Sequence, residues 1–186
     1  KARSTSPEWY HGTRGLRAHF DVVGLTPAPK QVKGFTVAAA KNRQSAVEAE
    51  VESLLDCPHY GERLAIYWLD LVRYADTVGY HGDQPHNISP YRDYVINALN
   101  SNVAFDQFTR EQLAGDLLPN PSQNQIVATG YNRLLQTTHE GGLQEAEYRA
   151  IYQADRVRNV SAVWMGATIG CAECHDCPLH TADAAD

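Results

Sequence analysis

Cysteine is scarce in this 186-residue chain, and three of its four cysteines lie within one short stretch near the end. Four cysteines at such uneven spacing do not make a disulfide framework, because Cys57 stands far from the other three. Long apolar runs are also missing, so we expect no membrane span. The N-terminal residues lack the apolar centre of a secretory signal.

Positively charged residues are also fewer than negatively charged ones. The chain has 16 Lys and Arg against 22 Asp and Glu, a formal net charge of -6, and its basic residues are scattered. Binding of nucleic-acid phosphates needs clustered Lys and Arg, so no nucleic acid is expected as a partner. The charge instead favours a partner protein with a basic face.

Strand signals are few, and hydrophobic residues, at 43%, are as frequent as in soluble globular proteins. Only "FDVVGL" at residues 20–25 looks strand-like, and "TPAP" after it predicts a turn into a short helix. Ser45 and Glu48 have the spacing of a capping box, and Pro58 should follow the end of that helix.

Helical patterns fill the remainder. The segment "YGERLAIYWLDLVRYAD" places Leu64, Tyr67, Trp68, Leu71, Val72 and Ala75 on one apolar stripe. Further starts are expected at Ser89 with Pro90, at Asp106 and at Ser122 with Gln125, and the last long helix should run from about Gln144 to Thr168. The sequence therefore predicts a mainly α, single irregular helical domain with a C-terminal C-x-x-C-H haem-attachment segment.

The cysteines gather in "GCAECHDCPLH", residues 170–180. Cys171, Cys174 and His175 complete the C-x-x-C-H motif of covalent haem attachment. Two thiols on one turn can each add to a vinyl group along one porphyrin edge, and the adjacent imidazole then lies beneath the ring to bind iron. One haem c is the expected cofactor.

Other chemistries share these residues. Cys177 extends the run toward a four-iron cluster, for which Cys57 would supply the fourth thiolate. Structural zinc would use two or three cysteines with His175 or His180, and the thiols are otherwise simply free or paired. The haem motif is favoured because it is complete within five residues, whereas an iron–sulfur cluster or a zinc site would need distant ligands from outside the motif.

The sixth ligand of the iron should come from outside the motif. His139 is the preferred candidate, because "TTHEGG" places it in a glycine-flexed loop before the last long helix. His81, His59 and Met165 follow as substitutes, and a five-coordinate or water-bound iron is the alternative. Single histidines in polar surroundings are more often surface or hydrogen-bonded residues, and this reading covers His11, His19, His59, His81 and His86.

Several longer motifs carry a family resemblance that spans residues 14–176. The chain is similar to the domain of unknown function in planctomycete cytochrome c-type proteins, and the matching stretches are "DVVGLTPAPKQVKGF", "HYGERLAIYWLDLVRYADTVGYHGD", "PYRDYVINALN", "FDQFTREQLAGDLLP", "ATGYNRLLQTTHEGG" and "DRVRNVSAVWMGATIGCAECHD". Residues 1–13 match poorly. Family members commonly continue from "CHD" into His-Lys-Phe-Asp-Pro, whereas this chain has Cys177 at the second histidine, so residues 177–186 form a divergent tail.

The resemblance implies roles for three residues and a setting for the chain. Cys171 and Cys174 would be the thioether cysteines and His175 the proximal ligand. Relatives are usually large exported proteins with cytochrome-like and carbohydrate-associated modules, which implies a periplasmic or cell-surface location and a larger assembly.

The expected function is electron transfer to a redox partner protein through one covalently attached haem. A scaffold or carbohydrate-associated interaction module with a structural metal site is the alternative outside redox chemistry. A peroxidase-like haem enzyme is the third class, and it would need an open iron position.

Overall fold

The computed structural model describes residues 7–80, 83–138 and 140–175. These residues are mainly helical, as the sequence predicts, and they contain no β-strand beyond two isolated bridges, Thr77 with Pro85 and Gly79 with Thr137. None of the described helices is long and apolar enough to cross a membrane. The chain forms two compact units, residues 1–66 with 95–103 and residues 67–94 with 104–186, where the sequence predicts a single domain.

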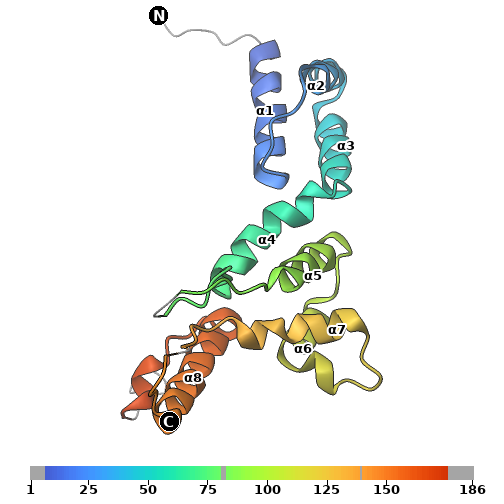
Figure 1. Cartoon of the computed structure of the whole chain (residues 1–186). Coiled ribbons are helices and arrows are strands. Elements are labelled where there is room, and N and C mark those ends of the chain that lie inside the picture. The colour runs from blue at the N-terminus through green and yellow to red at the C-terminus, as the bar shows by residue number, and fades with distance from the viewer. Residues whose placement is uncertain (1–6, 81–82, 139, 176–186) are drawn as a thin grey trace, which may run out of the picture. The chain divides into compact units, whose positions relative to one another are not determined.

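Unit 1 is built from three helices that pack against one another and from parts of two more (Figure 1). Phe35 and Ala39 pack with Ala46 in its hydrophobic core, and Val47 lies against them. The helices are α1 (Pro7–Val22), α2 (Pro29–Lys41) and α3 (Arg43–Leu55), followed by the first part of α4 (His59–Leu71) and the last part of α5 (Ser89–Asn100).

The strand predicted at residues 20–25 is wrong. Residues 20–22 belong to α1, and the helix ends where the backbone N–H groups of Val23 and Gly24 both donate to the carbonyl of His19, at 2.9 and 3.0 Å. The turn into a short helix is confirmed by α2, which begins at Pro29. The strand propensity of Val22 and Val23 does not override the helix that precedes them, because propensity acts only as a local bias.

The predicted cap of α3 is displaced by three residues. Asn42, rather than Ser45, caps this helix, and its side-chain oxygen accepts from the Ser45 backbone N–H at 3.2 Å. The Ser122 and Gln125 capping box of α7 (Gln123–Ala128) is confirmed in both of its hydrogen bonds. Asp106 lies inside the first turn of α6 (Phe105–Ala114), whose N-cap is Ala104.

Unit 2 has an aromatic core around Trp68. Its ring lies 4.9 Å from Phe108 and 5.6 Å from Trp164 between centroids, and Trp164 lies 4.9 Å from Tyr131. Tyr67 and Leu71, which the sequence places on the buried stripe of α4, are 55% and 52% exposed. Val72, on the same predicted stripe, is fully buried, so the buried face of this segment is narrower than predicted.

A buried carboxylate stabilises the same unit. The Glu111 side chain accepts hydrogen bonds from Tyr94 at 2.8 Å, Gln107 at 2.9 Å and Gln125 at 3.1 Å. Burial raises the pKa of this carboxyl, but the three hydrogen bonds lower it by more, so the pKa lies below its ordinary value. Glu111 therefore stays ionised as a structural acceptor at neutral pH.

Candidate functional site

The C-x-x-C-H segment follows the last long helix. Helix α8 runs over Glu145–Val160, shorter than the predicted 144–168, and continues as a π-helical turn, Ser161–Met165. Gly166 then takes a left-handed conformation, with φ 62°, which glycine adopts at little cost, and so ends the helical run. The chain enters a short 3₁₀ helix, η4, at Gly170–Glu173.

The two motif cysteines lie at the start and at the end of one turn. Cys171 belongs to η4, and Cys174 caps the C-terminus of this helix. The Cys171 carbonyl accepts from the backbone N–H of Cys174 and of His175, both at 3.3 Å, and closes this turn. All three side chains are exposed. Both thiols are therefore accessible to a group that approaches the turn from solvent.

An ion pair joins the motif to α8. Arg158 of this helix lies 3.1 Å from the Glu173 carboxylate, between Nη2 and Oε2, and Glu173 is a variable position inside the C-x-x-C-H motif. Both side chains are about half exposed, so the pair contributes less than about 1 kcal/mol to stability. Its effect is to orient the turn that carries Cys171 and Cys174 relative to α8.

The other predicted ligands are not assembled around this motif in the described residues. His139, His81, Cys177 and His180 lie outside the described residues. Met165 is described and is 71% exposed. No group of three or more His, Cys, Asp and Glu side chains within residues 7–80, 83–138 and 140–175 is arranged to hold a metal ion. Cys57 is half-buried and belongs to unit 1, whereas Cys171 and Cys174 belong to unit 2.

Two histidines have the structural roles that their surroundings predict. The His19 ring is buried and lies 2.7 Å from Glu50, between Nε2 and Oε1. The exposed His59 ring lies 2.7 Å from Glu62 in the first turn of α4, between Nδ1 and Oε2. His59 therefore has a partner within its own helix.

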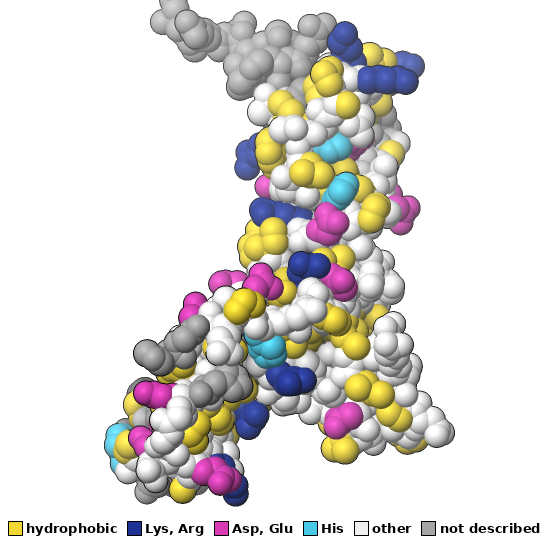
Figure 2. All heavy atoms as spheres, viewed as in Figure 1, with side chains coloured by type: hydrophobic (Ala, Val, Ile, Leu, Met, Phe, Trp, Pro, Cys, Tyr) yellow, Lys and Arg dark blue, Asp and Glu magenta, His cyan; other side chains and the backbone are white. Residues whose placement is uncertain are grey.

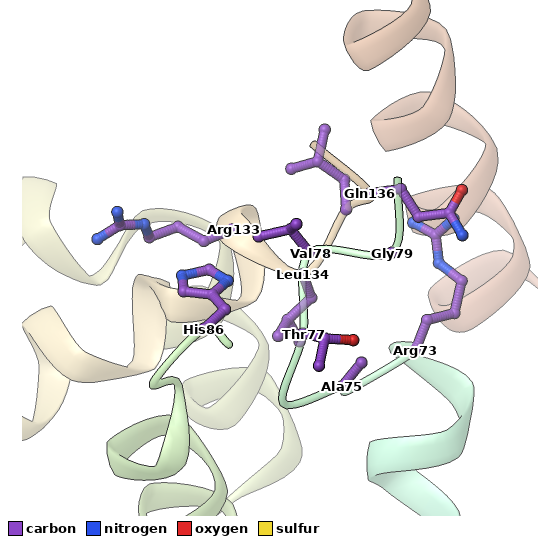
Figure 3. A pocket seen from close by; sticks show the side chains of 10 residues that line it. Arg73, Ala75, Thr77, Val78, Gly79, His86, Arg133, Leu134 and Gln136 are labelled. Carbon is purple, nitrogen blue, oxygen red and sulfur yellow. The ribbon is translucent and has the colours of Figure 1, made fainter. Parts of the chain in front are cut away.

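Two adjoining pockets in unit 2 were not predicted. The first, of about 260 Å³, lies between the loop that follows α4 and the segment that follows the 3₁₀ helix η2 (Thr129–Arg133) (Figure 3). The second, of about 400 Å³, shares His86 and Arg133 with the first and adds Arg156 of α8. No motif predicts these pockets, because their residues come from separate segments without regular spacing.

Comparison with protein families gives one match that covers nearly the whole chain. The family model described as PSCyt2, protein of unknown function (DUF1549), the planctomycete cytochrome C domain family, matches residues 2–186. The chain belongs to this family. The match includes residues 2–13 and 177–186, at both ends of the 14–176 segment in which the sequence motifs lie. No curated protein and no solved structure matches the chain.

Proposed function

We propose that the chain is a c-type cytochrome domain that carries one covalently attached haem and transfers electrons to a partner protein. The observation that supports this most directly is the η4 turn, which closes between the exposed Cys171 and Cys174 and is followed at once by the exposed His175. When bound, the haem supplies a one-electron redox centre.

Three residues hold the cofactor in this proposal. The Cys171 and Cys174 thiols would hold the haem through thioether bonds to its two vinyl groups, with each thiol proton going to the other vinyl carbon. The His175 imidazole would bind the iron. Covalent attachment suits a turn whose side chains are exposed, because the haem then stays in place without a deep enclosing pocket.

Location and partner are part of the same proposal. Haem attachment to C-x-x-C-H is completed outside the cytoplasm in bacteria, so we place the protein in the periplasm or at the cell surface.

The net charge of -6 favours a redox partner with a basic face. Acidic and basic side chains are interspersed over the face shown in Figure 2, so this attraction comes from the overall charge. Rising salt should slow electron exchange.

The test is expression of the full chain with a cytochrome c maturation system. The protein should keep its haem through denaturation and acid-acetone extraction. Cys171→Ser and Cys174→Ser should each lose one thioether bond, and the double variant should lose covalent haem altogether. Cys57→Ser is the matched control, because it removes a thiol that lies outside the motif. Wild-type protein that yields all its haem to acid acetone contradicts the proposal.

The same preparation separates the proposed function from the other classes. A reversible reduction wave with electron exchange to a physiological donor is the expected result for a carrier. An electrochemically inert haem would indicate a scaffold, and peroxide turnover would indicate a peroxidase-like enzyme. Zinc or iron with acid-labile sulfide in place of haem, measured by elemental analysis, would assign the cysteines to a structural metal site.

A further inference from the structure

Unit 2 contains a pocket region with arginine side chains among otherwise largely apolar walls, and it is separate from the C-x-x-C-H turn. None of the residues that line the two adjoining pockets belongs to η4, and both pockets have His86 and Arg133 in their walls. Their volumes of about 260 and 400 Å³ are of the order found for small-molecule sites. The region therefore has room for a small ligand.

The walls carry positive charge without acidic side chains. Arg73 lines the first pocket, Arg156 the second and Arg133 both, and no Asp or Glu is among the described lining residues of either. The Arg73 guanidinium is engaged with Asp155 at 2.7 and 2.8 Å. Arg133 and Arg156 form no ion pair with any residue that the structure describes. Arg156 nevertheless interacts electrostatically with Asp155, whose pKa it helps to lower.

Neutral hydrogen-bonding groups accompany these charges. Gln84 and Asn132 line the second pocket, and Thr77 and Gln136 line the first. In Figure 3, His86 and Arg133 lie at one end of the first pocket and Arg73 and Gln136 at the other. Guanidinium groups bind carboxylates and phosphates through paired hydrogen bonds, and amides and hydroxyls satisfy the remaining oxygens.

Hydrogen bonds to backbone carbonyls hold the pocket walls in place. The Thr137 N–H donates to the Val78 carbonyl at 3.1 Å, which joins the two loops across the pockets. The His86 N–H donates to the Asp76 carbonyl at 2.7 Å. Arg156 Nη2 donates to the Asn132 carbonyl at 3.3 Å, which holds its guanidinium beside the second pocket. A site ordered before binding costs less entropy when the ligand arrives.

We propose that these pockets bind a small oxyanion ligand, either a carboxylate or a phosphate or sulfate ester, through Arg133 and Arg156. The proposal is independent of the haem, because it rests on residues of segments 73–79, 84–86 and 132–137 and of α8. It gives the domain a ligand-binding activity beside its proposed redox role.

The test is titration of the full chain with citrate, inorganic phosphate and inorganic sulfate by calorimetry and thermal unfolding, at constant ionic strength set with sodium chloride. At least one probe should bind saturably and raise the unfolding temperature. Binding of citrate alone would identify a carboxylate ligand, and binding of phosphate or sulfate alone would identify a ligand with a phosphate or sulfate group. Failure of all three probes to bind saturably would overturn the proposal.

Variants separate a specific site from general charge attraction. Arg133→Gln should weaken binding of the active probe about tenfold or more, because it removes a charged hydrogen-bond donor. Arg110→Gln is the matched control, since it removes the same charge from an exposed residue of α6 that lines neither pocket. Arg133→Lys, which keeps the charge but not the planar fork, should give intermediate affinity. Equal losses in Arg110→Gln and Arg133→Gln would overturn the site.

Discussion

Arg73 and Asp155 face each other in a bidentate ion pair. Arg73 Nη1 lies 2.7 Å from Asp155 Oδ1, and Nη2 lies 2.8 Å from Oδ2. The hydrogen bond to Asp155 raises the pKa of Arg73, and the hydrogen bond from Arg73 lowers the pKa of the Asp155 carboxyl below its ordinary value. The pair joins the segment after α4 to α8, within unit 2.

Asp155→Asn should destabilise the protein near neutral pH and much less in acid. A lowered pKa in the folded state means that the ionised carboxylate adds stability above about pH 4, the ordinary value, and that this stability is lost as the pH falls through the folded value. The expected loss is about 1 kcal/mol at neutral pH, since both groups are partly exposed.

Urea unfolding at a series of pH values measures this difference. Asp106→Asn is the control, because Asp106 makes a more exposed ion pair with Arg110 and should change the unfolding free energy little. A loss for Asp155→Asn that stays constant from neutral pH down to pH 2 would show that the carboxylate charge is not its source.

Two helical glycines of unit 1 should respond to alanine in opposite directions. A Cβ at Gly61 would lie 2.6 Å from the Ile96 carbonyl oxygen and from the Asn100 side chain, whereas one at Gly34 meets nothing within 4 Å. Gly61→Ala should cost about 1–3 kcal/mol through overpacking. Gly34→Ala should add up to about 1 kcal/mol, because alanine is the better helix former.

Thermal unfolding followed by circular dichroism compares these two variants with the wild type. The unfolding temperature should fall for Gly61→Ala and rise for Gly34→Ala. Equal shifts in both variants would mean that the close approach of α4 and α5 at Gly61 does not limit the side chain there.

His139→Ala should change the iron coordination if His139 is the sixth ligand. This prediction rests on the haem proposal and on the sequence, since His139 lies outside the described residues. The ferric spectrum of the holoprotein should turn from low-spin to high-spin. A low-spin spectrum that persists would reject His139 and direct the search to His81, His59 or Met165; His86→Ala is a control at a pocket residue.

Local signals predicted some elements well and others poorly. Helix α5 follows from Ser89 and Pro90. The apolar residues that recur at helical spacing after them are buried at Tyr91, Tyr94, Val95 and Ala98 and half-buried at Leu99. These positions agree because the helix-start residues and the apolar spacing indicate the same helical face. The apolar spacing is a poorer guide in α8, where Val157 is 56% exposed. Periodicity identifies a helical face but not which neighbour covers it.

The two candidate sites also differ in how well the sequence predicts them. Cys171, Cys174 and His175 are adjacent in sequence, so their spacing alone indicates the turn that η4 provides. The wall of the two pockets is different, because Arg133 and Arg156 meet His86 only through the folding of unit 2. The basic residues are scattered along the sequence, yet three of the arginines line these adjoining pockets.

The division of α4 and α5 between the units affects the order in which the chain can fold during synthesis. Unit 1 needs residues 95–103, which follow the first segment of unit 2. It can therefore be completed as soon as residue 103 has left the ribosome. Residues 67–94 must wait for the chain beyond residue 104, so the apolar side chains around Trp68 stay without their partners Phe108 and Trp164 for that interval. Exposed apolar side chains of this kind are what chaperones bind during translation.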